Sequence, residues 1–206
     1  MITGKKVFND GDRIRATYLG KFSEAKLLPP AATEIAFIGR SNSGKSSLLR
    51  ALINADKMPQ VSAKPGSTRL MHAYRLGNDA ENQNGLMLVD FPGYGYAKSS
   101  AVFRARFSEM LLDYLQSKRN VRALCLMMDS RRMPEEEELE IAKIARQRHT
   151  SLLLCLNKVD QLNQKELAAL TKTWAGNKTF FEILAVSAAK RQNLDYLRTF
   201  ILSSGT

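Results

Sequence analysis

The sequence contains no long apolar stretch. Across its 206 residues, no run approaches the roughly eighteen consecutive apolar residues that a membrane-spanning helix requires. The N-terminal stretch includes Lys5 and Lys6, but no apolar block follows them, so no signal peptide is expected. With 44% hydrophobic and 25% charged residues, the composition is that of a soluble globular protein. We therefore expect one domain, located in the cytoplasm.

Cysteine and histidine are scarce. Cys125 and Cys155 lie inside apolar runs, and no other metal-ligand residue types cluster near them. A disulfide or a metal pair is therefore disfavoured, and two buried free thiols are expected. The two histidines, His72 and His149, have no partner pattern, so neither is assigned a catalytic role. The sequence also contains no internal repeat and no low-complexity tract.

Acidic residues are too few to balance the basic ones, and the formal net charge is +11. The surplus lies at the two ends of the chain. Residues 1–30 carry six Lys/Arg against three acids, and residues 143–206 carry ten against four, whereas the middle carries fifteen against thirteen. This distribution suits a basic surface that binds a polyanion such as RNA. Charge alone is equally compatible with a solvated basic surface.

The apolar residues alternate between strand and helix patterns, which predicts an α/β fold. Buried strands separated by helices indicate a mostly parallel sheet with helices on both faces. Residues 14–19 could form an edge strand within a basic N-terminal segment, 1–30, and the α/β domain would take 31–206. Residues 54–68 are expected to be a mobile loop, and Pro134 is expected at the first position of its helix. The expected strands are 34–38, 70–76, 86–89, 121–128, 151–156 and 180–186; the expected helices are 47–53, 103–115, 134–146, 164–174 and 194–202.

Residues 39–46, Gly-Arg-Ser-Asn-Ser-Gly-Lys-Ser, fit the spacing G-x-x-x-x-G-K-[ST] of a phosphate-binding loop. Gly39 and Gly44 permit a backbone in which successive N–H groups surround an anion. Lys45 can reach the β- and γ-phosphates, and the Ser46 hydroxyl can bind Mg²⁺. A strand before the loop and a helix after it complete the arrangement that holds phosphate.

Two further stretches can act on the terminal phosphate and the metal. Asp90-Phe91-Pro92-Gly93 follows a predicted strand, so Asp90 can support Mg²⁺ through water and the Gly93 N–H can meet a γ-phosphate. Thr68, in Pro65-Gly-Ser-Thr-Arg69, lies in the predicted mobile loop. Its hydroxyl could close on Mg²⁺ when a γ-phosphate is present.

The remaining motifs select guanine. In Asn157-Lys158-Val159-Asp160, the aspartate can accept from the ring N–H and the 2-amino group, and Asn157 can bond the far edge of the purine. The stem of Lys158 can lie over the ring. Adenine lacks this donor pair and would be rejected by roughly 10⁴. Ser187-Ala188-Ala189-Lys190, at the end of the last strand, completes the pocket, with the Ala188 N–H placed for guanine O6.

These motifs, G-R-S-N-S-G-K-S, P-G-S-T-R, D-F-P-G-Y-G, N-K-V-D and S-A-A-K, stand in the order of the small translational GTPases, and their combination resembles the EngB family (also called YihA or YsxC). The resemblance implies a Ras-like P-loop GTPase, Mg²⁺-dependent and monomeric, that serves assembly of the large ribosomal subunit and is linked to division septum formation. Its partner would be ribosomal RNA with ribosomal protein. Residues 55–69 and 90–101 would report the bound nucleotide. The catalytic residues would be Lys45, Thr68 and Gly93, and the metal site would comprise Ser46, Thr68 and, through water, Asp90. The nucleotide-binding residues would be Gly39, Arg40, Ser41, Asn42, Ser43, Gly44, Lys45, Ser46, Ser47, Gly66, Ser67, Thr68, Asp90, Phe91, Pro92, Gly93, Asn157, Lys158, Asp160, Val186, Ser187 and Ala188.

Two positions bear on the hydrolysis rate. Ras orients its attacking water with a glutamine after the D-x-x-G glycine, and Tyr94 stands there in this sequence, which predicts slow hydrolysis without a partner. Asn42 resembles an asparagine found in related GTPases that use K⁺ beside the phosphates. It could supply a carbonyl oxygen to such an ion, or it could only brace the loop.

Two other functional classes share part of this pattern. A P-loop kinase of a small metabolite would contain the phosphate loop but would not need N-K-V-D or S-A-A-K, so nucleotide selectivity separates it from a GTPase. A GTPase acting directly on the cell-division apparatus or membrane is compatible with the septation link. Against it, the sequence contains no amphipathic membrane helix.

Overall fold

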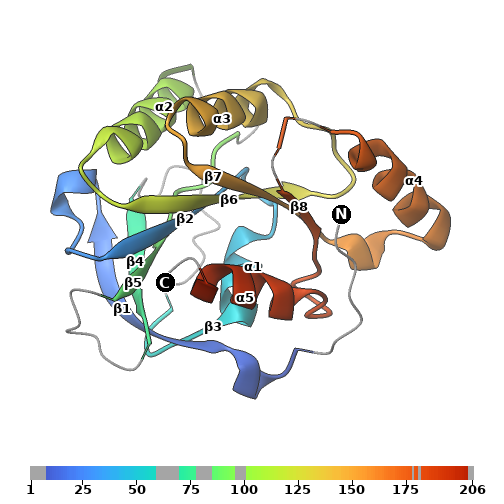
Figure 1. The fold of residues 1–206 in the computed structure, drawn as a ribbon, viewed down its shortest axis with the longest axis horizontal. Helices are drawn as coiled ribbons and strands as arrows, with labels where there is room; N and C mark the ends of the chain where they lie inside the picture. Colours follow the sequence, from blue (N-terminus) through green and yellow to red (C-terminus); the bar gives the residue numbers. More distant parts are fainter. Residues whose placement is uncertain are drawn as a thin grey trace.

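A computed structural model describes residues 8–58, 70–77, 85–95, 101–177, 179–180 and 182–203, with the backbone alone for residues 101–104. The expectations for Gly66, Ser67 and Thr68 lie outside these residues. Within them, the chain forms a sheet of eight strands in the order β3-β1-β4-β5-β2-β6-β7-β8 (Figure 1). The strands are β1 (Ile14–Phe22), β2 (Thr33–Gly39), β3 (Ile53–Ala55), β4 (Met71–Leu76), β5 (Leu86–Asp90), β6 (Val121–Asp129), β7 (Ser151–Asn157) and β8 (Glu182–Ala185).

The mostly parallel sheet expected from the sequence is confirmed. Strands β5, β2, β6, β7 and β8 run parallel, while β4 is antiparallel to both β5 and β1. Every residue of β2 is buried, and its side chains point alternately into two buried layers, one on each face of the sheet. Ala36 and Ile38 face one apolar cluster, and Ile35 and Phe37 face the other. A strand covered on both faces therefore appears in the sequence as a continuous apolar run.

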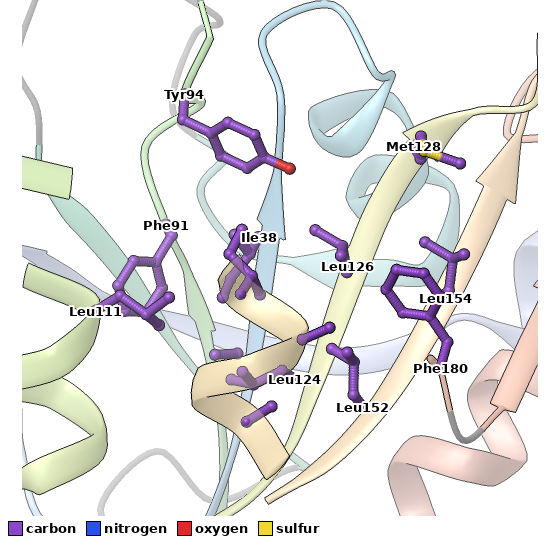
Figure 2. Close-up of a cluster of buried hydrophobic side chains, with 14 of the residues drawn as sticks. Ile38, Phe91, Tyr94, Leu111, Leu124, Leu126, Met128, Leu152, Leu154 and Phe180 are labelled. Carbon is purple, nitrogen blue, oxygen red and sulfur yellow. The ribbon is translucent and has the colours of Figure 1, made fainter. Parts of the chain in front are cut away.

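Helices cover both faces of the sheet. Figure 1 shows α2 (Ala101–Gln116) and α3 (Glu136–Gln147) together on one side and α1 (Lys45–Leu52) and α5 (Leu194–Ser203) on the other. The apolar cluster beneath α2 and α3 also contains Leu170 and Trp174 of α4 (Gln164–Ala175). Figure 2 shows part of this cluster, with Phe91 and Leu111 next to the strand residues Ile38, Leu124 and Leu126. Among the helices of the described segments, none is both long enough and apolar enough to cross a membrane.

Apart from shifts of up to three residues at element ends, the structure differs from the sequence expectation at the start of the expected loop, in the place of β1 and in the position of Pro134. Ile53 begins β3 instead of ending α1, and β3 pairs with β1 in parallel, so the first residues of the expected loop are a strand. Strand β1 consequently lies one position in from the edge, between β3 and β4, and not at the edge. Pro134 lies before α3, whose N-cap is Glu135, because the Glu135 and Glu138 side chains form a capping box at that end. The first turn of α3 holds the acids Glu136, Glu137 and Glu138.

A buried ion pair joins the start of β2 to the segment that follows α2. The Glu34 side chain is 1% exposed, and Arg119 lies against it, with its Nε donating to Glu34 Oε1 at 2.6 Å. The Tyr114 hydroxyl donates to the other carboxylate oxygen at 2.8 Å. Arg119 also donates to the carbonyl oxygens of Leu28, at 3.1 Å, and Pro29. The pair therefore fixes the entry to β2, the strand that leads into the phosphate loop.

The two cysteines are free and buried, as expected. Burial raises the pKa of both thiols well above its ordinary value. Such thiols remain protonated at neutral pH and behave as small apolar side chains.

Candidate nucleotide site

The loop between β2 and α1 has the shape of a phosphate cradle. Asn42 and Gly44 adopt left-handed conformations, with φ of 68° and 88°. A Cβ at Gly44 would lie 2.2 Å from Asn157 Nδ2, so glycine is required there for the approach as well as for φ. The first turn of α1 begins at Lys45, and the Leu48 N–H bonds to Gly44 O at 2.9 Å. The N–H groups of Lys45, Ser46 and Ser47 therefore precede the helical ladder and can meet an anion.

Lys45 and Asp90 lie together beside this cradle. Asp90 ends β5 next to β2, with which it pairs at Phe37, and its carboxylate forms an ion pair with Lys45 Nζ. Both side chains are largely buried. A lysine that can neutralise phosphate, at the start of α1, and an acid that can support a metal, at the end of β5, are thus adjacent.

The segment after Asp90 is bonded to the phosphate loop. The Ser41 N–H donates to Tyr94 O at 2.7 Å, and the Tyr94 N–H donates to Gly39 O at 3.3 Å. A Cβ at Gly93 would approach Ser41 Oγ to 3.1 Å. Arg40 adds a side-chain contact, because its Nε donates to Gly95 O at 3.1 Å. The Gly93 backbone is therefore held against the loop on which a γ-phosphate would lie.

Tyr94 is a core residue. Its side chain is 1% exposed, and its hydroxyl donates to Glu138 Oε1 of α3 at 3.0 Å. Its ring packs against Phe107 of α2 with centroids 5.0 Å apart, and Figure 2 shows it above Ile38 in the apolar cluster. Burial, followed by the charge of Glu138, raises the pKa of Tyr94 well above its ordinary value. The phenol at the Ras glutamine position is thus bonded within the core.

We expect the isolated protein to hydrolyse GTP more slowly than about 1 s⁻¹, and Tyr94→Phe to leave that rate within about threefold. The same variant should lose about 1–3 kcal/mol of unfolding free energy, because buried Glu138 loses a donor. Single-turnover hydrolysis and urea denaturation measure the two effects. Tyr196→Phe is the control, since its partner Glu182 is only partly buried. A rate reduced tenfold or more in Tyr94→Phe would instead give the hydroxyl a part in the reaction.

The guanine motifs meet the phosphate loop at the carboxyl ends of β7 and β8. Asn157 is buried, its Nδ2 donates to Ser43 O at 2.9 Å, and its Oδ1 accepts from the Ala188 N–H at 3.1 Å. Asp160 is exposed and accepts from the Ser187 hydroxyl. Val186 joins the two motifs, because its carbonyl oxygen accepts from the Val159 N–H at 3.3 Å.

Through these contacts, the Asn157 side chain links the phosphate loop to the segment that follows β8. The sequence predicts its amide at the purine edge and the Ala188 N–H at guanine O6, whereas in this structure the two groups bond to each other. One Nδ2 hydrogen of Asn157 is bonded to the phosphate loop, and the second leaves capacity for a base. The carboxylate of Asp160 retains acceptor capacity beyond its single bond to Ser187.

Three side chains next to the site were not assigned roles from the sequence. Glu138 holds Tyr94, Glu135 receives Arg40 in an ion pair, and Asp129 lies against Lys158. Asp129 carries a detectable signal, because it is an acid at the carboxyl end of a predicted strand. The sequence gives no such signal for Glu135 and Glu138, because acidic residues are equally typical of a helix N-terminus without any role at a site.

A phosphate loop between strand and helix, an aspartate at the end of the neighbouring strand and an N-K-V-D motif after β7 define a P-loop GTPase with a Ras-like fold. A family model described as "50S ribosome-binding GTPase" matches residues 34–158. The EngB protein of Laribacter hongkongensis is 35% identical over 90% of this chain and 83% of its own length. That of Desulforapulum autotrophicum is 40% identical over 69% and 73%. The chain belongs to the EngB family of GTP-binding proteins.

Solved structures agree with the fold. An EngB crystal structure superposes with a TM-score of 0.62 at 20% identity, covering 84% of this chain and 98% of that chain. The Era protein of Aquifex aeolicus, solved with GDP and aluminium fluoride, gives a TM-score of 0.61 at 25% identity over 83% and 56%.

Proposed function

We propose that this protein uses Mg²⁺-dependent GTP hydrolysis as a switch in assembly of the large ribosomal subunit, in the cytoplasm. The observation that carries the proposal is the meeting of Lys45, Asp90 and the Asn157–Asp160 motif at one edge of the sheet. The description of the matching family model supports the ribosomal partner. The basic surplus in residues 143–206 supports an RNA component of that partner.

Each residue of the site would have its own part in hydrolysis. Lys45 forms an ion pair with Asp90 here, and its side chain would move so that the ammonium group contacts the β- and γ-phosphate oxygens when nucleotide binds. The Gly93 N–H would donate to the γ-phosphate, where negative charge develops. Ser46 and Thr68 hydroxyls would ligate Mg²⁺ and Asp90 would support it through water. The metal, when bound, supplies positive charge at the same phosphate oxygens.

K⁺ binding at Asn42 is a further part of this proposal. Asn42 is exposed, and its backbone carbonyl oxygen accepts from Lys158 Nζ at 2.7 Å. Its side-chain oxygen would provide one ligand beside the phosphates, at the place where an arginine finger acts in other GTPases. Hydrolysis in K⁺ and in Na⁺ at matched ionic strength, for wild type and Asn42→Ala, tests this part separately.

The partner is tested by sucrose-gradient sedimentation of tagged protein with ribosomal subunits and membranes, in GTP, GDP and a non-hydrolysable analogue. We expect cosedimentation with large-subunit particles to depend on the nucleotide and to fall at least tenfold between about 50 and 200 mM salt, because counterions are released from RNA. Cosedimentation with membranes would instead favour the cell-division apparatus.

Charge reversal locates the RNA-binding surface. Lys143, Lys165 and Lys172 are exposed on α3 and α4, and changing all three to Glu should weaken particle binding while GTP affinity stays constant. The matched control reverses Lys57, Arg106 and Lys118, three exposed cations in the charge-balanced middle of the chain. Equal effects of the two triple variants, or no dependence on salt, would mean that the basic surplus of residues 143–206 is only a solvated surface.

A further inference from the structure

Lys158 connects the base pocket to the phosphate loop. It follows β7 in a left-handed conformation, with φ of 68°, which directs its side chain across the mouth of the site. Its ammonium has two acceptors in the structure, Asn42 O at 2.7 Å and Asp129 Oδ2 at 3.0 Å. An otherwise flexible lysine stem is thus held at its far end before any base is present.

Asp129 occupies the matching position on the neighbouring strand. It ends β6 and pairs in register with Asn157, so its carboxylate lies at the same edge of the sheet as the guanine motif. The Arg131 guanidinium holds it from the other side, with Nε 2.8 Å from Oδ1 and Nη2 2.6 Å from Oδ2. These hydrogen bonds hold the pKa of Asp129 well below its usual range, so the carboxylate facing Lys158 is ionised at neutral pH. Its side chain is 12% exposed, which limits the screening of this contact by water.

We propose that Asp129 is a positioning residue for the nucleotide base, fixing Lys158 so that the lysine stem forms one wall of the base pocket. The proposal rests on the guanine pocket proposed above. Without Asp129, the ammonium would keep only the Asn42 carbonyl, and the stem would have to be ordered again each time a base binds. Preorganisation of a long side chain chiefly lowers the rate of ligand release.

A purely local role for Asp129 has to be separated from this one. The Asp129 Oδ1 also accepts from the Arg131 N–H at 3.1 Å, and the Asp129 carbonyl oxygen accepts from the Arg132 N–H at 3.0 Å, so the residue shapes the turn after β6. Asparagine can keep both of these bonds. Asp129→Asn therefore removes the charge that faces Lys158 while it preserves the turn.

The experiment measures dissociation of fluorescent GDP and of its hypoxanthine counterpart IDP from full-length protein. We expect Asp129→Asn to accelerate release of both about tenfold and equally, because the lysine stem contacts the ring face and not the 2-amino group. The acceleration should disappear in a Lys158→Met background, because the two residues act as one unit. Asp113→Asn, an aspartate on α2 that accepts from the Ala25 N–H, is the matched control and should release at the wild-type rate.

Release at the wild-type rate in Asp129→Asn would overturn the inference, as would an effect that adds fully to that of Lys158→Met. Melting temperatures measured without nucleotide check that the variants remain folded, and Arg131→Ala keeps the Asp129–Lys158 pair as a second test with a smaller expected effect. Failure of the guanine pocket itself is distinguishable, because it would appear as an unchanged base preference in Asp160→Asn.

Discussion

Asp160→Asn is expected to reverse the base preference of the protein. The amide has one acceptor oxygen and one NH₂ donor, so it can still accept from the ring N–H of guanine, but its NH₂ meets the 2-amino group, which is also a donor. Xanthine has a 2-oxo group at that position, which accepts from the amide. Affinity for GDP should fall on the order of 10³ to 10⁴, whereas affinity for XDP rises above it. Competition against a fluorescent nucleotide measures both affinities.

Asp160→Asn should preserve the local structure of the pocket, because asparagine retains an oxygen that can accept from Ser187, the partner of Asp160 in this structure. Asp195→Asn, in the first turn of α5, is the matched control and should leave both affinities unchanged. Wild-type affinity for GDP in Asp160→Asn would contradict the assignment of the guanine pocket. The protein would then remain a phosphate-loop protein whose base contacts lie elsewhere.

Arg119→Ala is expected to cost about 3–5 kcal/mol of unfolding free energy, because it leaves the buried carboxylate of Glu34 with the Tyr114 hydroxyl and without its cation. The carbonyl oxygens of Leu28 and Pro29 lose the same donor. Urea denaturation at neutral pH measures the loss.

Arg122→Ala removes an exposed arginine three positions further along and should cost less than about 0.5 kcal/mol. Replacing both members of the pair, as Glu34→Gln with Arg119→Met, should cost less than Arg119→Ala, because no uncompensated charge remains buried. If Arg119→Ala were as mild as Arg122→Ala, the pair would contribute little to anchoring the segment before β2.

Much of the fold could be predicted from the sequence, because strands buried on both faces are continuous apolar runs. Each of the six strands predicted between residues 34 and 186 is present, although β8 is shorter than the expected 180–186. Strand β3 was missed because three residues that follow a helix directly carry no period of their own. The sequence likewise could not predict that β1 lies inside the sheet, because this position depends on its pairing with the short strand β3.

The sequence by itself determined the class of chemistry. Gly44, Lys45, Asp90 and Asp160 are recognisable by spacing, because phosphate and guanine demand particular residue types just beyond or at the carboxyl ends of parallel strands. Only the tertiary structure decided which side chains hold the residues that lie next to these motif positions. Tyr94 is bonded to Glu138 in the core, and Lys158 is held by Asp129, through pairs that lie 44 and 29 positions apart in the chain. No local sequence pattern predicts such pairs, because the parallel sheet brings together strand ends from distant parts of the sequence. Once these side chains are buried, a polar group left without a partner would cost free energy.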